Sequence, residues 1–222
     1  MTDGVKLGQH SVILPTGADG SRPSPATAGD MRLNTTSNLA EYYTGTVWKS
    51  VYAPYNVTYL VVAGGGSGGT AWSRTGNTAG GGGAGGLLTG TALAVPTTSY
   101  TVTVGSGGTS NPSNSAEPSG NAGNNSVFGT FATAIGDGYG ASPVVAGGDG
   151  GSGGGGGSQG SGYVGGGGTA GQGNSGGRGN TADGGAGGGG GAGSSGQNAP
   201  SGTQSGAGGN GTTSTITGSS VT

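Results

Sequence analysis

The sequence predicts a mostly β protein with irregular glycine-rich structure and essentially no α-helix. Glycine supplies 63 of the 222 residues and charged residues only 6%, which leaves too little apolar side chain for one large core. Short apolar and aromatic runs are separated by turn residues, a pattern typical of strands. Apolar residues nowhere recur at the three-to-four spacing of an amphipathic helix.

The first part of the chain is polar and then becomes aromatic. Residues 1–29 are predicted to be an extended lead-in with a short strand at Ser11–Leu14. Residues 30–53 read as a small β-meander that serves attachment or trimerisation, with tight turns between its strands. The expected strands are Met31–Asn34, Leu39–Tyr43 and Val47–Val51.

Aromatic side chains are expected to stabilise the 30–53 meander. Tyr42, Tyr43 and Trp48 would supply most of its buried area, with Trp48 as the main buried residue. A three-stranded unit of this size is marginal alone. We therefore expect these three residues to make packing or trimer contacts in a homotrimer.

Residues 54–146 are predicted to be a glycine-rich domain that contains β-strands. In Tyr100–Val104 the apolar residues alternate with threonines, so Tyr100, Val102 and Val104 share one face. The other expected strands are Tyr59–Ala63, Ser126–Ala134 and Ser142–Ala146.

Residues 147–222 are dominated by glycine, and two interpretations compete. A Gly/Ser-rich stretch is commonly a flexible linker. However, glycine recurs at every third residue from Gly147 to Gly156, fails at Gln159 and then resumes. Three residues per turn is the period of polyproline II, so the alternative is a packed bundle of polyglycine II helices whose inward positions must be glycine. Ser214–Thr217 is expected to be a last strand.

The chemistry of the chain excludes several functions. The formal net charge of −2 and the absence of a basic run give no electrostatic basis for binding nucleic acid. Without cysteine there is no disulfide framework or thiolate metal site. His10 reads as solvated, and Asp137, Asp149 and Asp183 are only weak candidates for holding a cation in a turn. We expect no enzyme activity, no cofactor, no metal and no membrane insertion.

Aromatic and basic residues inside the glycine-rich part allow two interpretations. They either pack as plugs over a flat glycine surface, or they are exposed recognition contacts for a sugar or a protein. The residues concerned are Trp72, Arg74, Tyr139 and Tyr163.

Two stretches resemble parts of phage proteins. MRLNTTSNLAEYYTGTVWKSV resembles a short element near the start of tailed-phage fibre and virion structural proteins, including those of cyanophages. The order YLVVAGGGSGG, GGGGAGGLLTGTALAV, SYTVTVGSGG and GNNSVFGTF is similar to the glycine-rich domain of phage tail proteins. The resemblance implies a non-enzymatic, extracellular virion part with a β/polyglycine II sandwich. In the resembling proteins ITGSSVT is followed by Tyr-Ala and more glycine, so we expect this chain to be truncated.

The expected function is therefore a tail-fibre or fibre-tip protein that acts as spacer and host-surface adhesin. Its expected partners are further copies of itself, other virion tail proteins and a host receptor, either a glycan or an outer-membrane protein. It would be made in the host cytoplasm without a signal peptide. Three alternatives stay open: an ice-binding protein of polyglycine II type, a flexible glycine-rich linker or surface protein, and an enzyme such as a tail depolymerase.

Overall fold

The computed structural model describes most of the chain and divides it into two compact units. Unit 1 comprises Met1–Asn56 and Leu93–Ser99, and unit 2 comprises Val57–Ala92 and Tyr100–Thr222. The prediction of a mostly β protein with essentially no helix is confirmed. The residues described are 13–51, 54–71, 77–94, 98–111, 118–160, 162–180 and 184–222.

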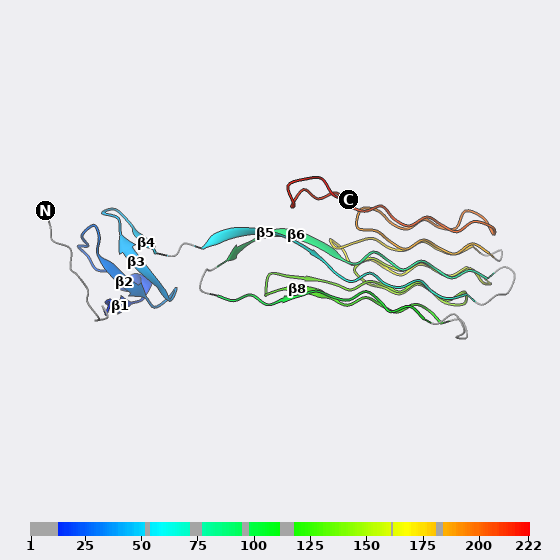
Figure 1. Ribbon diagram of the computed structural model, residues 1–222, viewed down its shortest axis with the longest axis horizontal. Coiled ribbons are helices and arrows are strands. Elements are labelled where there is room, and N and C mark those ends of the chain that lie inside the picture. Colours follow the sequence, from blue (N-terminus) through cyan, green and yellow to red (C-terminus); the bar gives the residue numbers. More distant parts are fainter. Residues whose placement is uncertain are drawn as a thin grey trace. The chain divides into compact units, whose positions relative to one another are not determined.

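Unit 1 contains the predicted meander. Its sheet has the order β1-β2-β3-β4 (Figure 1), with β2 and β3 at the predicted bounds and β4 shorter than predicted. Asn38 (φ 56°) and Gly45 (φ 97°) take the left-handed conformations that the tight turns require. The strands are β1 Thr16–Gly17, β2 Met31–Asn34, β3 Leu39–Tyr43 and β4 Trp48–Ser50.

The lead-in is more structured than expected. β1 pairs in parallel with β2 through Thr16 and Leu33. A short 3-10 helix, Asp19–Ser21, follows β1. The strand expected at Ser11–Leu14 lies partly outside the described residues.

The strands of unit 2 form two small sheets. β5 Tyr55–Val62 pairs with β6 Leu87–Ala94, and most of both strands belongs to unit 2. The second sheet has the order β7-β8-β9, with β7 Val102–Thr103, β8 Ser126–Phe128 and β9 Ala132–Ala134.

Three strand predictions in this part are wrong. The stretch 214–217 is not a strand, since Ser214 forms only an isolated bridge with Val221 and residues 216–217 lie in a turn. The stretch 126–134 is two antiparallel strands and not one, because Gly129 at φ 51° lets the chain reverse between β8 and β9. The stretch 142–146 is a turn and not a strand: the Val145 amide donates to the Ser142 carbonyl.

Beyond the strands, unit 2 is a bundle of extended segments held by backbone hydrogen bonds, which we call the glycine bundle (Figure 1). The direction in which its backbone amides donate hydrogen bonds repeats every three residues. In segment 63–70, the amides of Gly64, Ser67 and Thr70 donate to one neighbour, segment 118–125. Those of Gly66 and Gly69 donate to another, segment 78–86.

This period identifies the backbone conformation. In a β-strand the amides point alternately to two neighbours in one plane, whereas three directions require three residues per turn. Apart from Gly85, the glycines within the segments lie outside the positive-φ region, so the helices have the left-handed sense of polyproline II and not its mirror image. The glycine-rich stretch is therefore ordered polyglycine II.

The segments are arranged in layers connected by the hydrogen bonds. The outer layer contains 104–111, 63–70, 78–86, 185–191 and 204–211. The middle layer contains 118–125, 135–142, 151–158, 173–180 and 194–199. A short third layer contains 145–150 and 163–168. Segment 151–158 lies at the centre, buried throughout.

The close packing of the segments explains the composition. A Cβ added at Gly153 would lie 1.9 Å from the Gly166 carbonyl oxygen, and one at Gly156 would lie 1.9 Å from that of Tyr163. Since these contacts are with backbone, no side chain can move aside. Glycine is thus required at positions such as these, where the missing Cβ would point at the backbone of a neighbouring segment.

Residue 147 marks a change in composition only. The Gly81 amide donates to the Gly187 carbonyl, and the Gly155 amide donates to the Gly81 carbonyl, so segments from both sides of residue 147 pack together in one unit. The glycines at 147, 150, 153 and 156 also lie on two antiparallel segments, because the chain reverses near Gly151.

Candidate functional site

The buried face of the unit 1 sheet is charged. Arg32 and Glu41 are directly opposite on β2 and β3 and are 2% and 3% exposed. The Arg32 Nε lies 3.8 Å from Glu41 Oε2, and Arg22 Nη2 donates to Glu41 Oε1 at 2.6 Å. The hydrogen bond from Arg22, together with those charges and the Asn34 amide, lowers the pKa of the Glu41 carboxyl.

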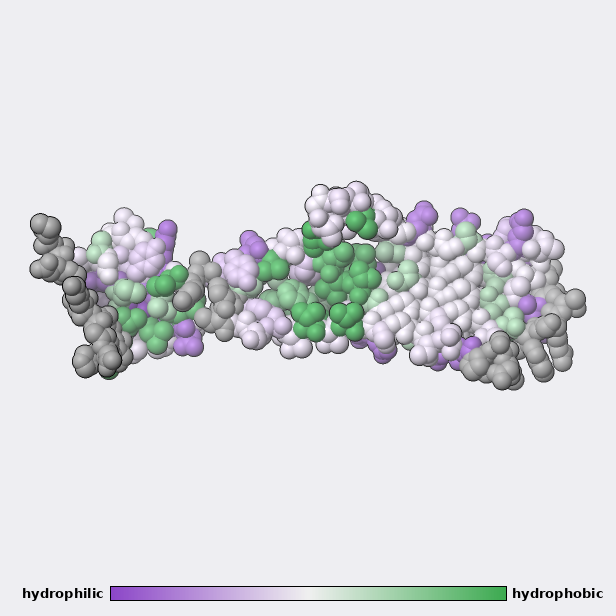
Figure 2. Space-filling model, viewed as in Figure 1, coloured by the Kyte–Doolittle hydropathy of each residue, from purple (hydrophilic) through white to green (hydrophobic). Residues whose placement is uncertain are grey.

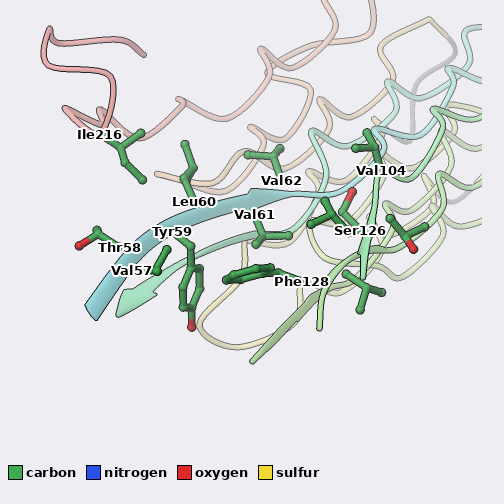
Figure 3. A pocket seen from close by; sticks show the side chains of 13 residues that line it. Val57, Thr58, Tyr59, Leu60, Val61, Val62, Val104, Ser126, Phe128 and Ile216 are labelled. Carbon is green, nitrogen blue, oxygen red and sulfur yellow. The ribbon is translucent and has the colours of Figure 1, made fainter. Parts of the chain in front are cut away.

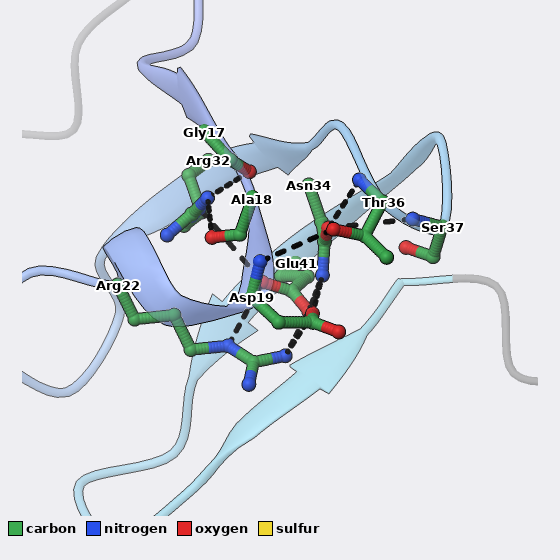
Figure 4. A network of polar contacts seen from close by, with 9 residues as sticks. All are labelled: Gly17, Ala18, Asp19, Arg22, Arg32, Asn34, Thr36, Ser37 and Glu41. Atoms are coloured by element: carbon green, nitrogen blue, oxygen red, sulfur yellow. Dashed lines mark hydrogen bonds and ion pairs between the residues drawn. The ribbon is translucent and has the colours of Figure 1, made fainter.

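Neutral groups complete this network (Figure 4). Asn34 Nδ2 donates to Glu41 Oε1 at 2.7 Å, and its Oδ1 accepts the Thr36 amide at 2.9 Å. Arg32 Nη2 donates to the carbonyls of Gly17 and Ala18. The network thereby ties β1 to the meander, although Arg32 Nε and Nη1 are buried without a hydrogen-bond partner.

The aromatic residues predicted as packing contacts lie beside this network. Trp48 is only half-buried and not the main buried residue, since Arg32, Asn34, Leu39 and Glu41 occupy that place. Its ring centroid lies 5.4 Å from that of Tyr43 and 5.9 Å from the Arg32 guanidinium carbon. Tyr42, on the opposite face, is 38% exposed.

Several turns of the glycine bundle lie at the end of unit 2 that is opposite to β5, β6 and β8 (Figure 1). We call this region the loop end; its described residues are 143–145, 159–160, 162 and 200–203. The Gln159 amide donates to the Pro143 carbonyl, which joins two of the turns. Arg178 Nε donates to the Gly162 carbonyl at 3.1 Å, which links segment 173–180 to the turn that contains Gly162.

The residues predicted for recognition separate into two groups. Tyr163 is half-buried and begins segment 163–168 beside the loop end. Tyr139 is half-buried within segment 135–142, and a Cβ on Gly148 would lie 2.6 Å from its ring. Tyr139 therefore packs over a glycine. Trp72 and Arg74 lie outside the described residues.

An apolar cleft of about 410 Å³ runs along the edge of β5. Figure 3 shows Leu60 and Val62 on one side of the strand, with Tyr59 on the other side beside Phe128. Tyr59 and Phe128 have ring centroids 5.6 Å apart, and Val104 is 83% exposed. Figure 2 shows apolar residues gathered here, whereas the glycine bundle is pale.

Asp137 is a buried carboxyl of unit 2, with no exposed surface. The Ser152 amide donates to its Oδ1 at 2.8 Å, and its Oδ2 has no hydrogen-bond partner. Burial raises the pKa of Asp137, opposed by the backbone amides of Gly85, Ser152, Gly66 and Gly138. In the sequence, Asp137 stands out as an acidic residue inside a glycine-rich run, where it is only a weak candidate for holding a cation.

Some kinds of site are not found in the part of the chain that the structure describes. Within it, no group of three or more His, Cys, Asp or Glu side chains could hold a metal ion. The same residues contain no helix long and apolar enough to cross a membrane.

Comparison with known proteins gives one result. The family model of the glycine-rich domain matches residues 40–222, which covers most of the chain, including most of β3, the whole of β4 and the whole of unit 2. No curated protein and no solved structure matches. The chain belongs to the glycine-rich domain family.

Proposed function

We propose that the chain is a structural component of a phage tail fibre or fibre tip that serves as spacer and host-surface adhesin. The observation that carries this proposal is the loop end. Turns from distant parts of the sequence are gathered there by a hydrogen-bonded bundle. Such an arrangement separates a constant scaffold from loops that tolerate change. The order of motifs shared with phage tail proteins also supports it.

The chemistry of the loop end suits a large, uncharged surface. Val144 is 41% exposed, and Val164, which follows Tyr163, is 58% exposed. Residues 200–203 add serine and threonine hydroxyls that are available for hydrogen bonds. A host glycan or an outer-membrane protein is the partner class that these groups fit. The mechanism is adhesion without a chemical step.

Unit 1 is proposed to attach the chain to other virion tail proteins and to associate as a homotrimer. Met31, Tyr42 and Val47 are 46%, 38% and 51% exposed, which leaves apolar surface for a partner on a small sheet. Native mass measurement of the purified chain tests this part. A trimer is expected, and a monomer at all concentrations would contradict trimerisation while leaving the fibre assignment open.

Antibodies raised against the purified chain test the fibre assignment. On particles whose genome encodes the chain, electron microscopy should show label on the tail fibres or their tips. The same antibodies should reduce adsorption of the particles to cells. Label confined to the head, or absent from particles, would contradict the proposal.

A second candidate is an ice-binding protein, favoured by the outer layer of the bundle. Gly68 faces outward, and a Cβ there would meet its nearest atom only at 3.7 Å, whereas a Cβ on Gly65, one turn earlier, would lie 3.3 Å from the Gly83 carbonyl oxygen. Small residues at regular spacing on a flat face are what such a function needs. A thermal-hysteresis assay decides: activity at micromolar protein supports this candidate, and none removes it.

A further inference from the structure

The packing around Asp137 is unusual because its carboxyl lies among backbone groups. A Cβ on Gly83 would lie 2.2 Å from Oδ2, so the carboxyl is in close contact with segment 78–86. Ser152, at the start of the central segment 151–158, donates its amide to Oδ1. The carboxyl thus joins segments of the outer and middle layers at a point where the chain reverses.

No positive side chain balances this carboxyl in the segments packed against it. Segments 63–70, 78–86, 118–125 and 151–158 contain no charged residue. The remaining neighbour, segment 145–150, carries Asp149, which is exposed and of like charge. Tyr139 is the other titratable group, on the same segment as Asp137.

An ionised Asp137 is therefore held by amide dipoles alone, with one oxygen unpartnered. Burying a charge without a counter-charge is unfavourable, whereas a protonated carboxyl avoids that cost. We propose that Asp137 is a proton-operated lock of the glycine bundle: binding of a proton to its carboxyl strengthens the bundle, and release of the proton loosens it.

The direction of the pH dependence follows from linkage. The pKa of Asp137 is raised in the folded bundle, so between the ordinary and the raised value the folded state binds more protons than the unfolded state. Stability then falls as pH rises through that window. Below the ordinary aspartate value the stabilisation is fully present.

The test compares the full chain with two matched variants, Asp137→Asn and Asp149→Asn. Urea unfolding of the bundle is followed through its glycine amide signals in ¹H–¹⁵N spectra, from about pH 5 to about pH 8. The wild-type midpoint should fall as pH rises. Asp137→Asn, which imitates the protonated form, should have the higher midpoint at the alkaline end and no such fall. Asp149→Asn should behave as wild type.

A fall that persists unchanged in Asp137→Asn would overturn the proposal, as would a wild-type midpoint that rises with pH. If Asp137→Asn does not fold, carboxyl ¹³C titration of the wild-type chain replaces it. Asp137 should then titrate above the ordinary aspartate value. A titration point for Asp137 at or below that value would also overturn the proposal.

Discussion

The two units reach order by opposite means. In unit 1, side chains decide the packing: Arg32, Asn34 and Glu41 are buried, Asn34 donates a hydrogen bond to Glu41, and Arg32 forms an ion pair with Glu41. In unit 2, beyond the small β layer, backbone amides and carbonyls hold one segment to the next. A buried ionic side chain needs a partner of opposite charge. Buried backbone amides and carbonyls instead need neighbouring segments placed so that each group finds a hydrogen-bond partner.

The difference shows what glycine contributes to the bundle. Glycine loses the most backbone entropy on ordering and has no side chain to bury, which predicts disorder for an isolated stretch. Removal of every Cβ, however, lets backbones approach closely enough to hydrogen-bond in three directions. Order in the bundle then depends on the number of neighbouring segments. We therefore expect added side-chain atoms to destabilise the bundle, and removal of side-chain atoms to destabilise unit 1.

The largest expected effect is the loss of an ionic partner in unit 1. Glu41→Ala leaves the buried Arg32 guanidinium without its carboxylate, and should destabilise unit 1 by about 3–5 kcal/mol. Lys49→Ala, at an exposed position of β4, is the control and should stay within about 0.5 kcal/mol of wild type. Chemical denaturation measures both, and equal effects would show that the network does not stabilise the sheet.

In the bundle, the matching change is the addition of one methyl group. Gly153→Ala would place its Cβ 1.9 Å from a backbone oxygen and should destabilise unit 2 by about 3 kcal/mol. Gly156→Ala and Gly165→Ala should act in the same direction. The control is Gly68→Ala, which faces outward and should be neutral or stabilising by up to about 1 kcal/mol. If all these variants have the same unfolding midpoint, close packing of the bundle is wrong.

Removal of an aromatic ring should have a smaller effect in unit 1. Trp48→Ala loses the Tyr43 and Arg32 contacts and should cost about 1–2 kcal/mol. A fully buried ring would cost about 3–5 kcal/mol. A loss in the higher range, measured by thermal unfolding at trimer-forming concentrations, would place Trp48 in an interface between copies.

The mildest test changes only the pH. The folded-state pKa of Glu41 is lowered, so its contribution is present above the ordinary glutamate value and is lost as pH falls through the lowered one. Lowering the pH should therefore first strengthen the bundle, as Asp137 gains a proton above the ordinary aspartate value, and then weaken unit 1, as Glu41 gains one below the ordinary glutamate value. Residue-resolved unfolding curves measure both, and a common direction in the two units would contradict this contrast.

Much of unit 1 could be predicted because local patterns decide it. The runs 31–34 and 39–43 were placed correctly from aromatic and apolar residues between turn residues. The charged core was missed because one charge in a strand looks exposed, and only the cross-strand pairing of Arg32 with Glu41 makes it internal.

The bundle could be predicted in kind but not in arrangement. The spacing of the glycines indicates the period of three. Because glycine is so frequent in this stretch, the same spacing does not show which segments become neighbours. Gly80, for example, contacts residues from two later segments, around Ala141 and Gly155. The loop residues Trp72 and Arg74 lie outside the described residues, so their predicted role stays a prediction.

Amide hydrogen exchange along segment 63–70 tests the central claim, that backbones packed with a period of three hold the bundle. Gly64, Gly66 and Gly69 donate to carbonyls of neighbouring segments, whereas, among the described residues, Gly65 and Gly68 donate to none. Slow exchange at the first three and fast exchange at the other two is therefore expected. Alternating protection would indicate a β-strand, and uniformly fast exchange a linker; either result would contradict the account.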